Sequence, residues 1–335
     1  MTNDRRHLYF HAPCFDGVVC AVLAADYAEM YDDSIAWDYR AVSYELKPRW
    51  LATRLPPRSV VVDFLYHPDA WLWADHHATS FATEDVQRVF ESRREPLHFY
   101  DPCADSCAGL LQRRLTALGH RNPAYDEHVV WAEKTDAARY SSVHEAIDAE
   151  APALRIHASL GVNADARYCA WLVRALRVKP LAEVARHAEV VERFQQRQLD
   201  TVDGLRRFEK SQRMEPDGIV VFDVDDPQLS INRYAPYVFH PDARYSIGIL
   251  RGRNVAKISA MRNPWREFPS VHLGRIFESK GGGGHHRVGS LYLKGEDIAL
   301  ARQYLQDILL QIRDPRVIER RDDGNDSHDR SVQLF

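Results

Sequence analysis

The sequence lacks the long apolar run that a membrane-spanning helix needs. Its hydrophobic stretches all fall far short of ~18 residues, and the apolar stretch near the N-terminus is far too short for a signal peptide. Cysteine is scarce as well, because the 335 residues include only five, without the spacing of a zinc motif. These absences argue against a disulfide scaffold, and we expect a reduced cytoplasmic protein that does not engage a membrane.

The chain also lacks a strong excess of charge of one sign and has little lysine. The formal net charge is −4, and only seven of the 44 Lys and Arg residues are Lys. A near-neutral chain does not coat nucleic acid over its whole surface, so any polyanion site must be a local basic patch. Arginine suits bidentate phosphate contacts. Codon bias in a GC-rich genome explains the same excess equally well.

Short apolar runs that alternate with helical segments predict an α/β fold. The length suffices for two domains. We expect a mostly parallel N-terminal sheet with flanking helices, a helical connector and a smaller C-terminal α/β lobe. The predicted domains are 1–180 and 214–314, with the connector at 181–213 and a polar tail at 315–335. Predicted strands lie at 7–11, 35–43, 59–64, 70–74, 97–100, 218–223, 245–250 and 255–261, and predicted helices at 18–28, 106–117 and 295–312.

Acidic and histidine residues recur where we expect these buried strands to end. The set comprises His11, Asp16, Asp63, Asp75, His76, His77 and Asp136. Ligands bind at the carboxyl ends of strands in open α/β sheets, so these side chains can meet there. Carboxylates with imidazoles suit Mn²⁺, Fe²⁺ or Zn²⁺ rather than Ca²⁺, and two such ions about 4 Å apart can hold a phosphoryl group. A lone Asp at a strand end is more often a turn or helix cap, so the hypothesis depends on the set.

A four-glycine run, Gly281 to Gly284, precedes His285 and His286. Without side chains, backbone N–H groups can approach phosphate oxygens closely. The alternative is a flexible turn before a strand. Cys103 and Cys107 are spaced as i, i+4 neighbours on a helix, and we interpret them as packing residues rather than a zinc pair.

In these residues the chain resembles the DHH phosphoesterase family with its DHH-associated C-terminal domain. The resemblance covers most of the length, and its markers are specific as an ordered set. They are His-Ala-Pro-Cys-Phe-Asp-Gly at 11–17, Val-Val-Val-Asp-Phe at 60–64, Asp-His-His-Ala-Thr-Ser at 75–80, Asp136, and Gly-Gly-Gly-His at 282–285.

The resemblance implies a two-lobed fold with the active site between the lobes, and two divalent metal sites, most often for Mn²⁺, with Zn²⁺ or Fe²⁺ as alternatives. By the same resemblance, Asp16, Asp63, His76 and Asp136 hold one ion, and His11 and Asp63 hold the other. Asp63, His76 and His77 are the implied catalytic residues, with His77 near the attacked phosphate. The implied substrate-binding groups are Arg262, Gly282, Gly283, Gly284 and His285.

The chain departs from the family pattern in its first motif and after its glycine run. Cys14 stands where a first aspartate is expected, and Cys20 stands where a small Ser is common. A Cys14 thiolate can replace the missing carboxylate and would favour a softer ion such as Zn²⁺. The alternative is a small packing residue. Val288-Gly-Ser follows the glycines where Ala-Ala-Gly is common.

The resulting hypothesis is a metal-dependent phosphoesterase, similar to nanoRNases and exonucleases, that cuts phosphodiester or phosphomonoester bonds of short single-stranded oligonucleotides or small nucleotides. The competing hypothesis is a catalytically decayed protein that binds a nucleotide or docks a partner, and Cys14 is the feature that favours it. The sequence is compatible with a homodimer and does not fix the oligomeric state.

Overall fold

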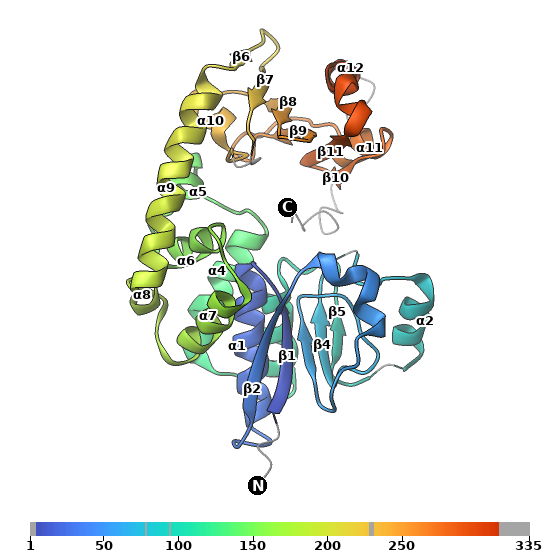
Figure 1. Ribbon diagram of the computed structural model, residues 1–335, viewed down its shortest axis with the longest axis vertical. Helices are drawn as coiled ribbons and strands as arrows, with labels where there is room; N and C mark the ends of the chain where they lie inside the picture. The colour runs from blue at the N-terminus through green and yellow to red at the C-terminus, as the bar shows by residue number, and fades with distance from the viewer. Residues whose placement is uncertain (1–4, 78, 94, 228–230, 315–335) are drawn as a thin grey trace. The chain divides into compact units, whose positions relative to one another are not determined.

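The computed structural model describes residues 5–77, 79–93, 95–227 and 231–314, and the side chain of His285 is not among those described. The predicted polar tail at 315–335 and Ala78 of the Asp-His-His motif therefore lie outside the described residues. The chain divides into two compact units, one formed by 1–139 with 150–197 and the other by 140–149 with 198–335. Figure 1 shows both units and labels most of their helices and strands.

The first unit contains a five-stranded sheet in the order β2-β1-β3-β4-β5, and every neighbouring pair is parallel. This confirms the predicted parallel α/β fold. Its strands are β1 (Arg5–His11), β2 (Ala36–Val42), β3 (Val60–Val62), β4 (Leu72–Asp75) and β5 (His98–Tyr100). Its helices are α1 (Phe15–Glu29), η1 (Tyr44–Ala52), α2 (Glu84–Arg93), α3 (Cys107–Ala117), η2 (Pro123–Tyr125), α4 (Asp126–Asp136), α6 (Pro152–Leu160), α7 (Ala166–Val178) and α8 (Leu181–Val184).

Apolar residues occupy both faces of this sheet, because successive strand side chains point to opposite faces. Leu8 and Phe10 of β1 join a core that includes residues of α1, α3, α4, α6 and α7. Tyr9, between them, joins an aromatic cluster on the other face with Trp50 and Trp73. A strand buried on both faces has an unbroken run of apolar residues. These strands could therefore be predicted from the sequence.

The second unit contains a six-stranded sheet in the order β10-β11-β9-β8-β7-β6, in which only β7 and β8 pair in parallel. The predicted hairpin is confirmed as β8 and β9. The elements are α5 (Val143–Asp148), β6 (Gln212–Met214), β7 (Ile219–Asp225), α10 (Ala235–Phe239), β8 (Tyr245–Arg251), β9 (Val255–Arg262), α11 (Leu273–Glu278), β10 (Gly283–His285), β11 (Val288–Lys294), η3 (Gly295–Leu300) and α12 (Ala301–Arg313). Helix α9 (Ala188–Glu209) has residues in both units.

The segment 140–149 belongs to the second unit although it lies between parts of the first. Ile147 shares a core with Phe208 and Val220, and the Trp265 indole donates a hydrogen bond to the Tyr140 carbonyl at 2.9 Å. The predicted division at 180 and 213 differs here, because it placed 140–149 in the first domain. The functional roles predicted for the two domains stay predictions.

Cys103 and Cys107 lie on different elements. Cys103 is in the turn before α3, where its N–H donates to the Asp101 carboxylate at 3.0 Å, while Cys107 is the first residue of α3. The predicted helical i, i+4 relation between these cysteines is therefore wrong, because Ser106 caps the helix after Cys103.

Among the described residues, no helix is long and apolar enough to cross a membrane.

Candidate metal centre

The carboxyl ends of three adjacent strands supply the histidine and acidic side chains predicted from the sequence. His11 is the last residue of β1, Asp63 follows β3 directly, and Asp75 ends β4 before His76 and His77. Because β1, β3 and β4 are neighbours in the sheet, these residues lie along one edge. The Asp63 N–H also donates to the Ala74 carbonyl at 2.8 Å, which extends the β3–β4 pairing to the site.

Two carboxylates of the set come from helices. Asp16 lies in the first turn of α1, and Asp136 is the last residue of α4. The sequence interpretation of Asp136 as a strand-end residue is therefore wrong. Asp16 also accepts hydrogen bonds from the N–H groups of Cys107 at 2.7 Å and Ala108 at 2.9 Å, at the N-terminus of α3. These bonds fix the carboxylate in one orientation. The Cys20 thiol also donates to Oδ1 at 4.0 Å, so Oδ2 is the oxygen that keeps a further lone pair.

The first cluster brings Asp16, His76 and Asp136 together, with one donor atom of each lying within 4.8 Å of the others. His76 Nδ1 lies 3.0 Å from the Ala104 carbonyl oxygen, which favours an N–H at Nδ1 and turns Nε2 toward Asp136, 3.1 Å away. A backbone carbonyl that holds one ring nitrogen while the other faces ligands is the usual support of a metal-binding histidine.

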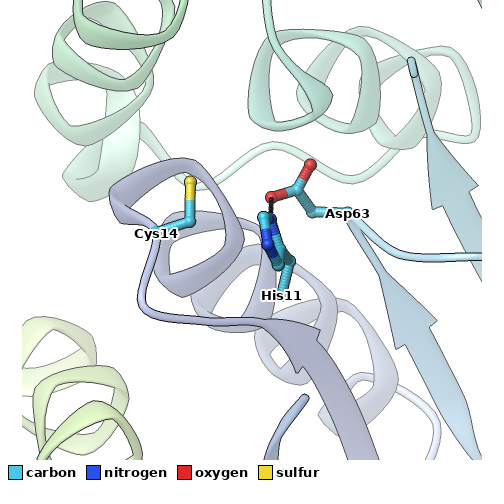
Figure 2. Close-up of side chains that lie close together, drawn as sticks. All are labelled: His11, Cys14 and Asp63. Carbon is cyan, nitrogen blue, oxygen red and sulfur yellow. Dashed lines mark ion pairs between the residues drawn. The ribbon is translucent and has the colours of Figure 1, made fainter. Parts of the chain in front are cut away.

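The second cluster consists of His11, Cys14 and Asp63, again with one donor atom of each within 4.8 Å of the others. Figure 2 shows the three side chains, which come from the end of β1, the turn before α1 and the end of β3. His11 Nδ1 lies 3.5 Å from Asp63 Oδ2. Cys14 occupies the N-cap position of α1, but its side chain does not cap the helix.

Asp63 links the clusters, because it also groups with His76 and His77. Its side chain is fully buried, and neither oxygen accepts a hydrogen bond from a described residue. A buried carboxylate without donors is costly, so this position fits a carboxylate that coordinates cations. Asp63 also has a positive φ of 54°, a left-handed conformation that Asp and Asn tolerate better than most residues.

Charge repulsion within the site favours the same interpretation. Burial, followed by the charges of Asp63 and Asp136, raises the pKa of Asp16 well above its usual range. Burial opposes a charged His76, but the Asp136 carboxylate, 3.1 Å from Nε2, and the charges of Asp16 and Asp63 raise its pKa well above normal. Burial and the charges of Asp63, Asp136 and Asp16 raise the pKa of the Cys14 thiol. Divalent cations would relieve this repulsion, so the donor set fits two metal ions.

Sequence reasoning included Asp75 in the Asp-His-His motif but assigned it no role of its own. Its Oδ1 lies 2.7 Å from His77 Nδ1 and accepts from the His76 N–H at 2.8 Å, while Ser80 Oγ donates to Oδ2 at 2.5 Å. Burial alone would lower the pKa of His77, but the Asp75 charge and hydrogen bond raise it to about 9. Asp75 thus holds the His77 ring with Nε2 turned away from it. The Ser five residues after the first letter of Asp-His-His is the sequence signal that could have indicated this support.

We expect Asp75→Asn to lower kcat about 10- to 100-fold with little change in KM, because the His77 ring loses the anion that orients it. Steady-state kinetics beside metal analysis check this, and both ions should remain bound. Ser80→Ala, which leaves the His77 contact intact, should have a smaller effect. Loss of an ion in Asp75→Asn would instead make Asp75 a ligand, and an unchanged kcat would remove its positioning role.

The predicted substrate-binding residues lie in the second unit. Arg262 ends β9 and is buried; its guanidinium donates to the carbonyls of Asn263 and Phe268 and lies over the Phe268 ring at 4.4 Å. Its N–H donates to the Arg287 carbonyl at 2.8 Å, so its backbone adjoins the turn after the glycine run. These contacts of Arg262 thus organise its own loop.

The four glycines of the run, 281–284, differ in their structural environment. A Cβ at Gly282 would lie 2.4 Å from the Ser290 carbonyl oxygen, and one at Gly284 would lie 2.2 Å from that of Val288. Gly281 and Gly284 have positive φ values of 84° and 152°. A Cβ at Gly283 would meet nothing within 4 Å. Close contact with β11 or a positive φ therefore explains Gly281, Gly282 and Gly284, whereas neither explains Gly283.

Comparisons with solved structures identify the fold of this chain. No family model and no curated protein matches the chain. A solved pGpG-specific phosphodiesterase, PggH from Vibrio cholerae, is 19% identical with a TM-score of 0.67 over 90% of this chain and 99% of its own. A structure described as the DHH domain of a member of the s1p family of ribosomal proteins is 14% identical, with a TM-score of 0.58 over 92% of this chain and 86% of its own. RecJ in complex with Mn²⁺ from Thermus thermophilus is 13% identical, with a TM-score of 0.53 over 91% of this chain and 51% of its own. The chain has the fold of the DHH phosphoesterases.

Proposed function

We propose that this protein is a metal-dependent phosphoesterase that hydrolyses phosphodiester or phosphomonoester bonds of short oligonucleotides or small nucleotides. The observation that carries the proposal is Asp63, a fully buried carboxylate that accepts no hydrogen bond from a described residue. It belongs to the cluster of His11 and Cys14 and also groups with His76, a member of the other cluster. A carboxylate within reach of two divalent ions fits a site that transfers phosphoryl groups, because two ions about 4 Å apart can stabilise both the attacking and the leaving oxygen.

In this proposal Asp16, His76 and Asp136 would hold one ion and His11 the other, with Asp63 available to both. The ions would supply Lewis-acid polarisation of the phosphate and activation of water. His77, held by Asp75, would donate a hydrogen bond to the phosphate, because the Asp75 charge favours the protonated ring. The fold shared with a Mn²⁺ complex of RecJ supports Mn²⁺ as the first ion to try.

The similarity in fold to a pGpG-specific phosphodiesterase supports a dinucleotide-sized substrate. The test is a panel of pGpG, five-nucleotide RNA and DNA, cyclic dinucleotides, bisphosphonucleosides and pyrophosphate, each with Mn²⁺, Zn²⁺ or Mg²⁺. Mononucleotide release from the dinucleotide or the pentamers is the expected result. Hydrolysis of pyrophosphate alone would remove the oligonucleotide proposal, and no hydrolysis in any arm would favour a nucleotide-binding protein.

The proposed substrate-binding groups are Arg262, His285 and the backbone of Gly282, Gly283 and Gly284. Gly283→Ala tests the glycine run, because a methyl group there meets open space and should leave the hairpin folded. If phosphate approaches this backbone, KM should rise about tenfold, or about 1.4 kcal/mol, with little change in thermal stability.

Gly282→Ala is the matched control, because its methyl group would meet the Ser290 carbonyl oxygen and should lower the melting temperature. Kinetics on pGpG and a thermal melt of each variant provide the measurement. Parent-like kcat/KM in a folded Gly283→Ala protein would mean that the glycine run serves only as a turn.

A further inference from the structure

The two ligand clusters differ in the chemistry of their donors. Asp16, His76 and Asp136 offer two carboxylate oxygens and one imidazole nitrogen, whereas the cluster in Figure 2 offers nitrogen, sulfur and oxygen. We propose that Cys14 coordinates the second ion as a thiolate, and that the centre therefore holds two different metals. This inference rests on the proposed function for the presence of two ions.

Geometry and burial support the sulfur ligand. Cys14 Sγ lies within 4.8 Å of donor atoms of His11 and Asp63, in the turn between β1 and α1. Asp63 is the independent observation, because its fully buried oxygens accept no hydrogen bond from a described residue. A cation held between Cys14, His11 and Asp63 would give that carboxylate its missing partner.

The softness of the donor decides which ion binds. A thiolate and a carboxylate carry the same charge, so sulfur at this position changes the preference among ions rather than the total charge. Thiolate ligands select Zn²⁺ and similar ions, while carboxylates suit Mn²⁺ and Mg²⁺. On binding, the S–H bond breaks, the sulfur electron pair goes to the metal and the proton passes to the buffer. The cluster of His11, Cys14 and Asp63 is thus a zinc-class position beside a manganese-class position.

Cobalt provides a direct readout of sulfur coordination, because a thiolate bound to Co²⁺ absorbs in the near ultraviolet and a carboxylate does not. Metal-free protein reloaded with Co²⁺ should show this band at an intensity of one thiolate per chain. Cys14→Ser should lose it. Cys14→Asp should still bind cobalt, without the band, which keeps the test valid if the Ser variant folds poorly. Cys103→Ser is the matched control, since this partly buried cysteine belongs to the same unit and should keep the band. Cys20→Ala should also keep it, although Cys20 Sγ lies 4.0 Å from Asp16.

Metal competition is the second measurement. Dialysis against Zn²⁺ with excess Mn²⁺ should leave one ion of each kind on the parent, whereas Cys14→Asp should lower the Zn-to-Mn ratio at least about tenfold. Absence of the band in the parent, or its persistence in Cys14→Ser, would overturn the sulfur ligand. Two ions of one kind on the parent would overturn the mixed centre. Manganese-supported hydrolysis without the band would leave the proposed function intact, and the band without any hydrolysis would remove only the function.

Discussion

Asp63→Asn is expected to lower kcat about a thousandfold or more, which corresponds to about 4 kcal/mol of transition-state stabilisation. Asp63 is the carboxylate common to the clusters of His11 and His76, so its loss affects both proposed ions. Asparagine keeps the side-chain shape and tolerates the positive φ of 54° at this position, so the backbone should stay in place. The measurement is kcat on the best substrate of the panel, with bound metal counted in the same samples.

Asp101→Asn is the matched control for this substitution. Asp101 follows β5 in the same sheet but belongs to neither ligand cluster, and its carboxylate accepts the Cys103 N–H. We expect near-parent turnover and metal content in this variant. Equal activity of parent and Asp63→Asn would show that the buried carboxylate has no part in the chemistry.

Gly17→Ala is expected to lower activity about a hundredfold although it removes no ligand. A Cβ at Gly17 would lie 2.1 Å from the His11 carbonyl oxygen and 3.1 Å from Asp63 Oδ2. Helix α1 must therefore move away from the end of β1, and displacement of ligands by about 1 Å can cost about a hundredfold in rate. Overpacking of this kind also destabilises by about 1–3 kcal/mol, so the melting temperature should fall.

Gly109→Ala in α3 provides the comparison. Its methyl group would meet Glu133, but the nearest atom, 2.0 Å away, is the end of a flexible and partly exposed side chain. Alanine also favours a helix over glycine by about 1 kcal/mol, so this variant should be close to the parent in stability and turnover. Kinetics and thermal melts of both variants provide the measurement. A Gly17→Ala protein that is as active as the parent would mean that a methyl group fits between α1 and the end of β1 without displacing the ligands.

The sequence predicted the parallel sheet well for a physical reason. Strands such as β1 and β4 are buried on both faces, so they appear as unbroken apolar runs, and the polar residues after them mark the edge where ligands bind. His11, Asp63 and the Asp-His-His motif could therefore be placed together before any coordinates. The shared DHH fold agrees with the motif resemblance.

Residues that meet only through tertiary packing were harder to place. Asp136 ends a helix, and nothing local shows that α4 brings this carboxylate to His76. Likewise, the support of His77 by Asp75 and Ser80 depends on the turn after β4. The segment 140–149 joins a core built mostly of residues beyond 198, a long-range association without a local pattern. The roles of the individual site residues stay proposals.

Metal add-back to metal-free protein, with pGpG hydrolysis followed at each step, is the decisive measurement for a two-metal phosphoesterase. We expect no turnover in chelator and a rate that rises until two divalent ions are bound per chain, whereas Asp63→Asn should not reach this rate. Full turnover without metal would contradict a metal-dependent site, and so would two bound ions without hydrolysis of any substrate in the panel.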